Sequence, residues 1–197
     1  MNETRNDLLT DLGLADGNFT SLNAFVSGEH RYIRDLRINL KNTLESPHFT
    51  KKQAYFIALA VAVNERSSHL IDSFTRSAER EGATAAEIAE VHAVASMLAT
   101  LNVYYRFRHF SGNKHYETLQ AGIKMTIMVR PVLGKIFFEL LSLVVSAVNG
   151  CETCVNSHEQ AVRHEGGTQE LIFDAIRLGS VVRGLVVALN PSGAVGQ

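Results

Sequence analysis

The stretch Phe138-Glu-Leu-Leu-Ser-Leu-Val-Val-Ser-Ala-Val-Asn-Gly-Cys-Glu-Thr-Cys-Val-Asn-Ser-His158 predicts two helices joined by a turn. Its first part is mostly apolar and ends at Asn149-Gly150, a pair that favours a turn after a helix. The second part begins with Cys151 and Cys154 and continues to His158. Residues three, four and seven positions apart share one face of a helix. We therefore expect both cysteines and the histidine on the same side of the second helix.

The same helical spacing of apolar residues recurs along the chain. Three sets follow it: Ile33, Leu36, Leu40 and Leu44; Leu70, Ile71, Phe74 and Ala78; and Ile172, Ala175, Ile176 and Gly179. Thr50-Lys-Lys-Gln53 and Thr84-Ala-Ala-Glu87 fit the capping box that begins a helix. Gly166-Gly167 followed by Thr168 fits the end of one helix and the start of the next. We predict an all-α protein of roughly eight to ten helices, because helices average about 11–12 residues.

Two short segments recur at nearly equal intervals, which indicates an internal repeat. Ala62-Val-Asn64 is echoed by Ala147-Val-Asn149. Glu81-Gly-Ala-Thr84 is echoed by Glu165-Gly-Gly-Thr168, and the two intervals differ by a single position. Each half then reads as an apolar helix, a turn, a second helix and a third apolar helix. We predict a duplicated helical unit.

The repeat divides what we expect to be one compact domain. The expected parts are an N-terminal helical extension over residues 1–45, a first repeat over 46–130 and a second repeat over 131–197. The first repeat carries Ser67 and Leu70 at the positions of Cys151 and Cys154 in the second. We therefore expect only the C-terminal repeat to carry the active site.

The composition argues against several classes of function. The 19 Lys and Arg residues against 20 Asp and Glu give a net charge of −1, so no nucleic-acid surface is expected. Tyr104 to Phe110 mixes aromatic and basic residues, but we expect a helix with a buried aromatic side or a subunit contact there. No apolar run reaches the roughly 20 residues that cross a membrane. The first residues lack the form of a secretory signal, so we predict a cytoplasmic protein.

The two cysteines carry most of the functional information. One Cys-x-x-Cys in a chain without an export signal indicates redox chemistry. Cys151 would lie at a helix start, where free N–H groups and the helix dipole favour a thiolate. One helical turn places the two Cα atoms about 5–6 Å apart, as a disulfide requires. Two alternatives stay open, a zinc site with His158 and His164 and a non-catalytic redox sensor, although the spacing matches no common zinc signature.

Glu139 is a charge embedded in apolar sequence, so it must find a partner or change its pKa. It precedes the Asn149-Gly150 turn by ten residues, or ~15 Å of helix, and His158 follows the turn by ~12 Å. An antiparallel hairpin would bring the two side chains to similar depth. A carboxylate that orients an imidazole, which in turn activates a thiol, is the arrangement of covalent catalysis.

The spaced set Glu139, Cys151, Cys154 and His158 resembles the catalytic pattern of the AhpD-type alkyl hydroperoxidases, in the carboxymuconolactone decarboxylase-like superfamily. Three flanking segments are also similar to the family: 138–151, Asn102-Val-Tyr-Tyr-Arg106 and Leu36-Arg-Ile-Asn-Leu40. The resemblance covers about residues 30–190. One departure is Thr153, where the best-known members carry His directly before the second cysteine. The proton relay that this His would provide is therefore lost here or moved to His158 and Glu139.

The resemblance implies an all-α fold with a duplicated unit, a homo-oligomer that is often a trimer, and thiol-dependent reduction of hydroperoxides. It implies no bound cofactor or metal, and a redox-active Cys151–Cys154 disulfide that a dihydrolipoyl protein or an AhpC-like peroxiredoxin recycles. A lactone-converting activity is a further alternative, although decarboxylase members lack this cysteine pair as a rule.

The resemblance also implies a role for each residue of the site. Cys154 would attack the peroxide, and Cys151 would condense with it to give the disulfide, although these two roles could be exchanged. Cys151 is expected to be the more exposed cysteine and to take the incoming reductant. His158 would shuttle the proton, and Glu139 would orient His158.

Overall fold

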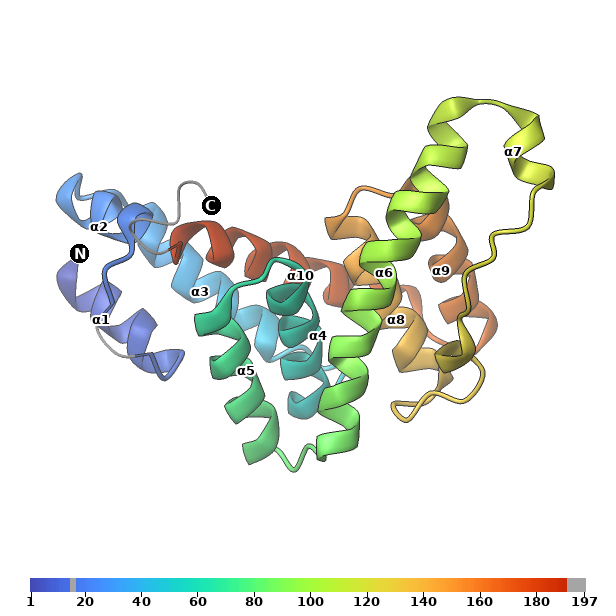
Figure 1. Cartoon of the computed structure of the whole chain (residues 1–197). Helices are drawn as coiled ribbons and strands as arrows, with labels where there is room; N and C mark the ends of the chain where they lie inside the picture. Colours follow the sequence, from blue (N-terminus) through green and yellow to red (C-terminus); the bar gives the residue numbers. More distant parts are fainter. Residues whose placement is uncertain (15–16, 191–197) are drawn as a thin grey trace.

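The computed structural model describes residues 1–14 and 17–190, and it confirms the all-α prediction. Ten α-helices and one short 3-10 helix lie in this part of the chain (Figure 1). The helices are α1 Asn2–Asp11, α2 Thr20–Ser27, α3 Tyr32–Leu44, α4 Lys51–Asn64, α5 Ser68–Arg80, α6 Ala85–Ser111, α7 Lys114–Thr118, η1 Thr126–Met128, α8 Lys135–Val148, α9 Glu152–His164 and α10 Gln169–Ala188. None of the described helices is long and apolar enough to cross a membrane.

The helix starts follow the local signals in the sequence. Thr50 and Gln53 form a capping box at α4, and Thr84 and Glu87 form one at α6. The Thr168 side chain accepts a hydrogen bond from the backbone N–H of Leu171 at the start of α10. Such caps satisfy N–H groups that have no partner within the helix, and each stabilises it by about 1 kcal/mol. The capping predictions are confirmed.

Two helices form the centre of the core. α4 is buried from Phe56 to Ala62, and α8 is buried from Phe137 to Ser146. A helix that is apolar all round must be covered on every side. Accordingly α4 packs against α5, α6, α8 and α10, and α8 packs against α4, α6, α9 and α10. The site-bearing helix α9 therefore lies against one of the two most deeply buried helices of the molecule.

The two three-helix sets recur with the same spacing. α4, α5 and α6 begin at Lys51, Ser68 and Ala85, and α8, α9 and α10 begin at equal intervals, at residues 135, 152 and 169. This spacing agrees with the predicted repeat, and an origin by duplication stays a prediction. The two asparagines at the turns are not equivalent, because Asn64 is the last residue of α4 whereas Asn149 follows α8.

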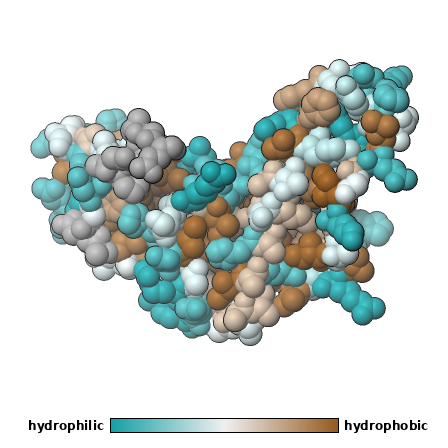
Figure 2. Space-filling model, in the orientation of Figure 1, coloured by the Kyte–Doolittle hydropathy of each residue, from teal (hydrophilic) through white to brown (hydrophobic). Residues whose placement is uncertain are grey.

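The second half of α6 extends beyond the helix bundle and leads into α7 (Figure 1). This extension carries Tyr104 to Phe110, where Phe107 is 54% exposed and Phe110 is 73% exposed. The expectation of a buried aromatic side is therefore wrong, because the extension projects past the helices that cover the rest of α6. Apolar residues are visible on the surface of the extension (Figure 2). A subunit contact here stays a prediction.

A strap, residues 119–134, returns the chain from α7 to α8 and includes the short helix η1. Its end is attached to α6 by the buried carboxylate of Glu90. The backbone N–H groups of Val132 and Leu133 donate to the two Glu90 oxygens at 2.7 and 2.6 Å. The strap is thereby held beside α6, and two of its residues line a cavity together with residues of α6 and α9.

Candidate active site

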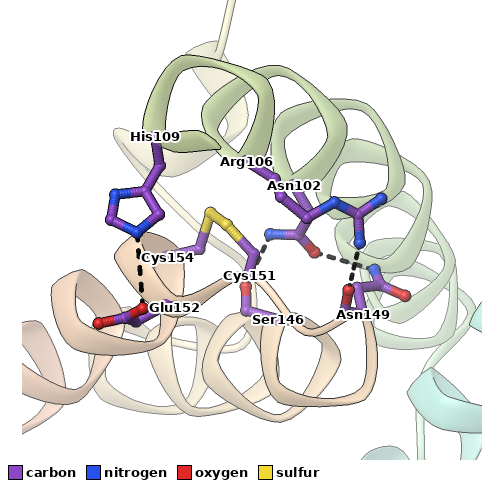
Figure 3. The surroundings of a disulfide bond; sticks show 8 residues. All are labelled: Asn102, Arg106, His109, Ser146, Asn149, Cys151, Glu152 and Cys154. Carbon is purple, nitrogen blue, oxygen red and sulfur yellow. Dashed lines mark hydrogen bonds and ion pairs between the residues drawn. A yellow bond between two sulfur atoms is a disulfide. The ribbon is translucent and has the colours of Figure 1, made fainter. Parts of the chain in front are cut away.

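Cys151 and Cys154 form a disulfide at the start of α9 (Figure 3). Cys151 is the N-cap residue of α9, and Cys154 lies in its first turn. Their Cα atoms are 5.3 Å apart, within the range expected from helical spacing. The positive end of the helix dipole therefore lies at the cysteine pair, where it favours a thiolate once the disulfide is reduced.

The relative exposure of the cysteines is opposite to the expectation. Cys151 is 1% exposed and Cys154 is 6% exposed, so the prediction that Cys151 is the more accessible sulfur is wrong. The cause is the turn before α9, which directs Cys151 back toward α8. The backbone N–H of Cys151 donates to the Ser146 carbonyl at 3.1 Å. Cys154, one turn later, lines a cavity instead.

Glu139 and His158 meet as the hairpin geometry predicts. α8 and α9 pack against each other, and the Glu139 Oε2 atom is 2.7 Å from His158 Nδ1. Both side chains are buried. The sequence analysis missed the third member, Lys135, whose Nζ atom is 2.8 Å from Glu139 Oε1. Its position four residues before Glu139, on the same helix face, was the available signal.

The electrostatics of this group favour an ionised Glu139. Burial raises the pKa of the Glu139 carboxyl, but hydrogen bonds from His158 and Lys135, together with the positive charge that each carries when protonated, outweigh it, and the net pKa is lowered. An ionised carboxylate can only accept, so His158 Nδ1 carries the hydrogen and donates it. Nε2 is then the ring nitrogen left to take up a proton.

A cavity of about 290 Å³ lies beside the disulfide. α9 contributes four residues to its wall, α6 contributes three and the strap contributes two: Thr153, Cys154, Ser157 and His158; Leu98, Leu101 and Tyr105; Met125 and Met128. Most of this wall is apolar, so the cavity suits an organic group rather than a small polar solute. It brings such a group to the Cys154 sulfur and the His158 ring.

A chain of amides fixes the turn before Cys151, and the sequence analysis did not assign it a role. Asn102 of α6 donates to Ser146 Oγ at 3.0 Å and accepts from Asn149 Nδ2 at 2.9 Å. Asn149 also exchanges two hydrogen bonds with Asn64, at 2.9 and 3.1 Å. Arg106 donates to the Asn149 carbonyl at 2.7 Å. Figure 3 shows these α6 side chains facing the turn on one side of the disulfide.

On the other side of the disulfide, His109 of α6 faces Glu152 of α9 (Figure 3). Their nearest atoms, Nε2 and Oε2, are 3.5 Å apart. Both side chains are largely exposed, so the pair is a weak link between the two helices.

The zinc alternative finds no support among the described residues. No group of three or more His, Cys, Asp or Glu side chains there could hold a metal ion. His158 Nδ1 already bonds to Glu139, and the His164 side chain is 87% exposed at the far end of α9. His164 therefore does not join His158 and the cysteines in one cluster.

The chain is similar to known proteins over most of its length. Residues 116–190 match the model of the carboxymuconolactone decarboxylase family. The chain is 39% identical over 160 residues to an alkyl hydroperoxide reductase AhpD of Anaeromyxobacter dehalogenans (strain 2CP-C), covering 81% of this chain and 86% of that relative. It is 35% identical over 163 residues to the AhpD of Azorhizobium caulinodans, covering 83% and 90%.

A solved structure shares the fold. It is described as a gamma-carboxymuconolactone decarboxylase subunit from Burkholderia xenovorans LB400. The two structures superpose with a TM-score of 0.67 over 94% of this chain and 93% of that one, at 15% identity. At that identity the likeness establishes the fold alone.

Proposed function

This chain belongs to the alkyl hydroperoxide reductase AhpD family, and from that premise we propose that it reduces alkyl hydroperoxides with electrons carried by Cys151 and Cys154. The observation that carries the proposal is the disulfide at the start of α9 together with the buried Glu139–His158 pair, 2.7 Å apart. The apolar cavity at Cys154 suits the alkyl part of such a substrate.

The first step oxidises the reduced protein. His158 takes the proton of the Cys154 thiol, and the thiolate attacks the terminal oxygen of the hydroperoxide. A sulfur–oxygen bond forms, the oxygen–oxygen bond breaks, and the alkoxide leaves with the proton that His158 returns. The products are an alcohol and a Cys154 sulfenic acid. Glu139 orients the imidazole and stabilises its protonated form during the transfer.

The second step closes the disulfide. The Cys151 sulfur attacks the sulfenic acid sulfur, the sulfur–sulfur bond forms, and water leaves. In the disulfide that results, the two Cα atoms are 5.3 Å apart, within the usual range for such a bond.

The third step returns the protein to the dithiol. Because Cys154 lines the cavity and Cys151 is almost fully buried, we propose that the thiolate of the reductant attacks Cys154. Cys151 then leaves as a thiolate at the helix start and collects a proton. The second thiol of the reductant displaces Cys154, so one external dithiol is oxidised for each hydroperoxide reduced. A dihydrolipoyl protein or an AhpC-like peroxiredoxin as partner, a homo-oligomer and a cytoplasmic location stay predictions.

The test is hydroperoxide consumption with dihydrolipoamide as the reductant. We expect turnover by the wild type and none by Cys151→Ser or Cys154→Ser. With stoichiometric peroxide, Cys151→Ser should consume one equivalent and hold a sulfenic acid, whereas Cys154→Ser should consume none. Ser67→Ala is the matched control, because Ser67 is the corresponding N-cap of α5, and it should keep the wild-type rate.

The same experiment distinguishes the proposed enzyme from the non-catalytic redox sensor that the sequence left open. A redox sensor would be oxidised once by peroxide and would not sustain turnover with dihydrolipoamide. Full activity in both cysteine variants would rule out the proposed mechanism.

A further inference from the structure

The buried Glu139 carboxylate has two basic neighbours, one on each oxygen. Lys135 Nζ is 2.8 Å from Oε1, and His158 Nδ1 is 2.7 Å from Oε2. Lys135 lies one helical turn before Glu139 on α8, and its side chain is 39% exposed. His158 comes from α9 and is nearly buried. The proposed mechanism uses Glu139 and His158 and assigns nothing to Lys135.

Charge balance gives Lys135 a role. A buried carboxylate needs a positive partner, because an unpaired charge away from water is costly. Lys135, whose Nζ atom is 2.8 Å from Oε1, supplies that partner. His158 can then bond to Glu139 as a neutral ring that donates its Nδ1 hydrogen. Without Lys135, a proton on His158 would be the remaining source of balancing charge.

Few other groups act on the His158 ring. Tyr105 of α6 and Cys154 of α9 share its cavity, and the strap contributes only the uncharged side chains of Met125 and Met128. Among the described residues, α10 contributes none to that wall. His109 and Glu152 are paired with each other at the start of α9. In the disulfide form neither cysteine titrates, so the charged groups connected to the ring are Glu139, by a direct contact, and Lys135, through Glu139.

We propose that Lys135 is a positioning residue that keeps His158 neutral in the disulfide form, so that Nε2 accepts the proton of the incoming reductant thiol. The proposal rests on the proposed function, and it concerns the step in which the disulfide is reduced. The thiol proton passes to Nε2, the resulting thiolate attacks Cys154, and His158 returns the proton to the departing Cys151 thiolate. No further reactant is needed for this balance.

Lys135 also contacts the strap. Its Nζ atom donates to the Met128 carbonyl at 3.3 Å, and the Met128 side chain lines the cavity. Lys135→Met therefore removes a charge and loosens a contact at once. The test must include a measurement that only the charge affects, and a variant that keeps the charge.

The chain provides a matched control for that charge. Lys51 is the first residue of α4, as Lys135 is of α8. Its Nζ atom lies 5.9 Å from the centre of the Tyr55 ring, and its side chain lines a different cavity from that of His158. Lys51→Met removes an equal charge from the same helix position in the other repeat.

The first measurement is the titration of the His158 ring by NMR in the oxidised full-length protein. In Lys135→Met we expect the midpoint to move upward by about one pH unit, the effect of losing one nearby charge. Lys135→Arg should restore the wild-type midpoint, and Lys51→Met should leave it unchanged. An unchanged midpoint in Lys135→Met, or an equal shift in Lys51→Met, would overturn the proposal.

The second measurement is the single-turnover rate of disulfide reduction by dihydrolipoamide across pH. Lys135→Met should be about ten-fold slower on the acidic limb and equal to the wild type on the alkaline side of the profile. A rate lowered equally at every pH would indicate a structural role and contradict the proposal. Neither measurement uses peroxide. If the wild-type disulfide is reduced by dihydrolipoamide but the protein consumes no hydroperoxide, the proposed function is refuted and this inference is not contradicted.

Discussion

Glu139 links the two titratable side chains of the site, and its charge determines how easily His158 can hold a proton. If His158 takes the Cys154 proton, the imidazolium is stabilised by the carboxylate 2.7 Å away. Glu139→Gln keeps the shape and one hydrogen bond but removes that charge, and it leaves Lys135 to repel the imidazolium. We expect the reduced protein to react with iodoacetamide about ten-fold more slowly at neutral pH.

The control for this variant is Glu159→Gln, which removes a carboxylate from α9 one residue beyond His158. Its side chain is partly exposed and pairs with Arg163, at 3.5 Å. It should react like the wild type. Equal alkylation rates for Glu139→Gln and the wild type would show that the carboxylate does not assist the thiol.

Asp174 is another carboxylate with several hydrogen-bond partners, and we expect it to contribute to stability. Hydrogen bonds from Ser46 and His48 hold the pKa of the Asp174 carboxyl below its usual range, with a further contribution from Arg177. A lowered pKa stabilises the fold above the unfolded-state value of about 3.9, and this contribution is lost as the pH falls through the lower folded-state value.

Asp174→Asn should therefore lower the free energy of unfolding by about 1–3 kcal/mol at pH 6. The difference from the wild type should shrink as the pH falls below 4. Urea unfolding at a series of pH values measures both. A difference that stays constant to pH 3 would show that the Asp174 charge does not contribute.

The core of the site could be predicted because it is local in sequence. Helical spacing alone places Cys151, Cys154 and His158 on one face, and a two-helix hairpin brings Glu139 to them. The relative exposure of the cysteines could not be predicted, because it depends on how the turn folds back against α8. The hydrogen bonds of Asp174 could not be predicted, because its partner Ser46 lies far from it in the sequence, in the segment before α4.

At the scale of helices, the turn between α8 and α9 is stabilised by hydrogen bonds from side chains of α6. Asn102 is 1% exposed, donates to Ser146 and accepts from Asn149. Asn102→Ala would remove both hydrogen bonds and leave the buried Ser146 hydroxyl without this partner. We expect the free energy of unfolding to fall by about 1–3 kcal/mol.

Thr100→Ala is the control on the same helix, because Thr100 is exposed and its side chain makes a long hydrogen bond to the Ser96 carbonyl, at 3.4 Å. Urea unfolding should separate the two variants clearly. Similar small losses in both would mean that the amide chain is not a stabilising element of the turn.

The helix boundaries were largely predictable, whereas the segment between the repeats was not. Capping boxes and glycines are local signals, and they mark α4, α6, α9 and α10 closely. The course of the strap depends on Glu90, which binds backbone N–H groups in a distant segment of the chain. A carboxylate within a helical pattern gives no indication that it will accept such bonds.

At the scale of the whole molecule, two similar three-helix sets share one core, and the second carries the cysteine pair together with Glu139 and His158. When the sets are aligned by their helix starts, Tyr55 takes the place of Glu139, and Phe74 takes the place of His158. Phe74 is almost fully buried, so the residue at this position of the first set packs in the hydrophobic core. The fold class and the repeat spacing could be predicted from periodicity, but the way the two sets meet depends on side-chain shape.

Gly179 of α10 marks a place where α10 and α8 approach closely, beside α4 of the first set. A Cβ atom there would lie 2.6 Å from Val144 Cγ1 of α8 and 3.7 Å from Val61 Cγ2 of α4. Val144 is buried and β-branched, so it cannot turn away freely. Overpacking costs about 1–3 kcal/mol, whereas replacing a helical glycine by alanine gains about 1 kcal/mol. Gly179→Ala should therefore lower the free energy of unfolding.

Gly184 provides the comparison on the same helix, since a Cβ atom there would meet only the Tyr32 hydroxyl, at an ordinary 3.5 Å. Gly184→Ala should raise the free energy of unfolding by up to about 1 kcal/mol, because it gains helix propensity without a clash. The opposite signs of the two changes, measured by urea unfolding, isolate the packing of α10 against α8 from helix propensity. If Gly179→Ala stabilises the protein as much as Gly184→Ala does, the packing of α10 against α8 does not require a glycine at position 179.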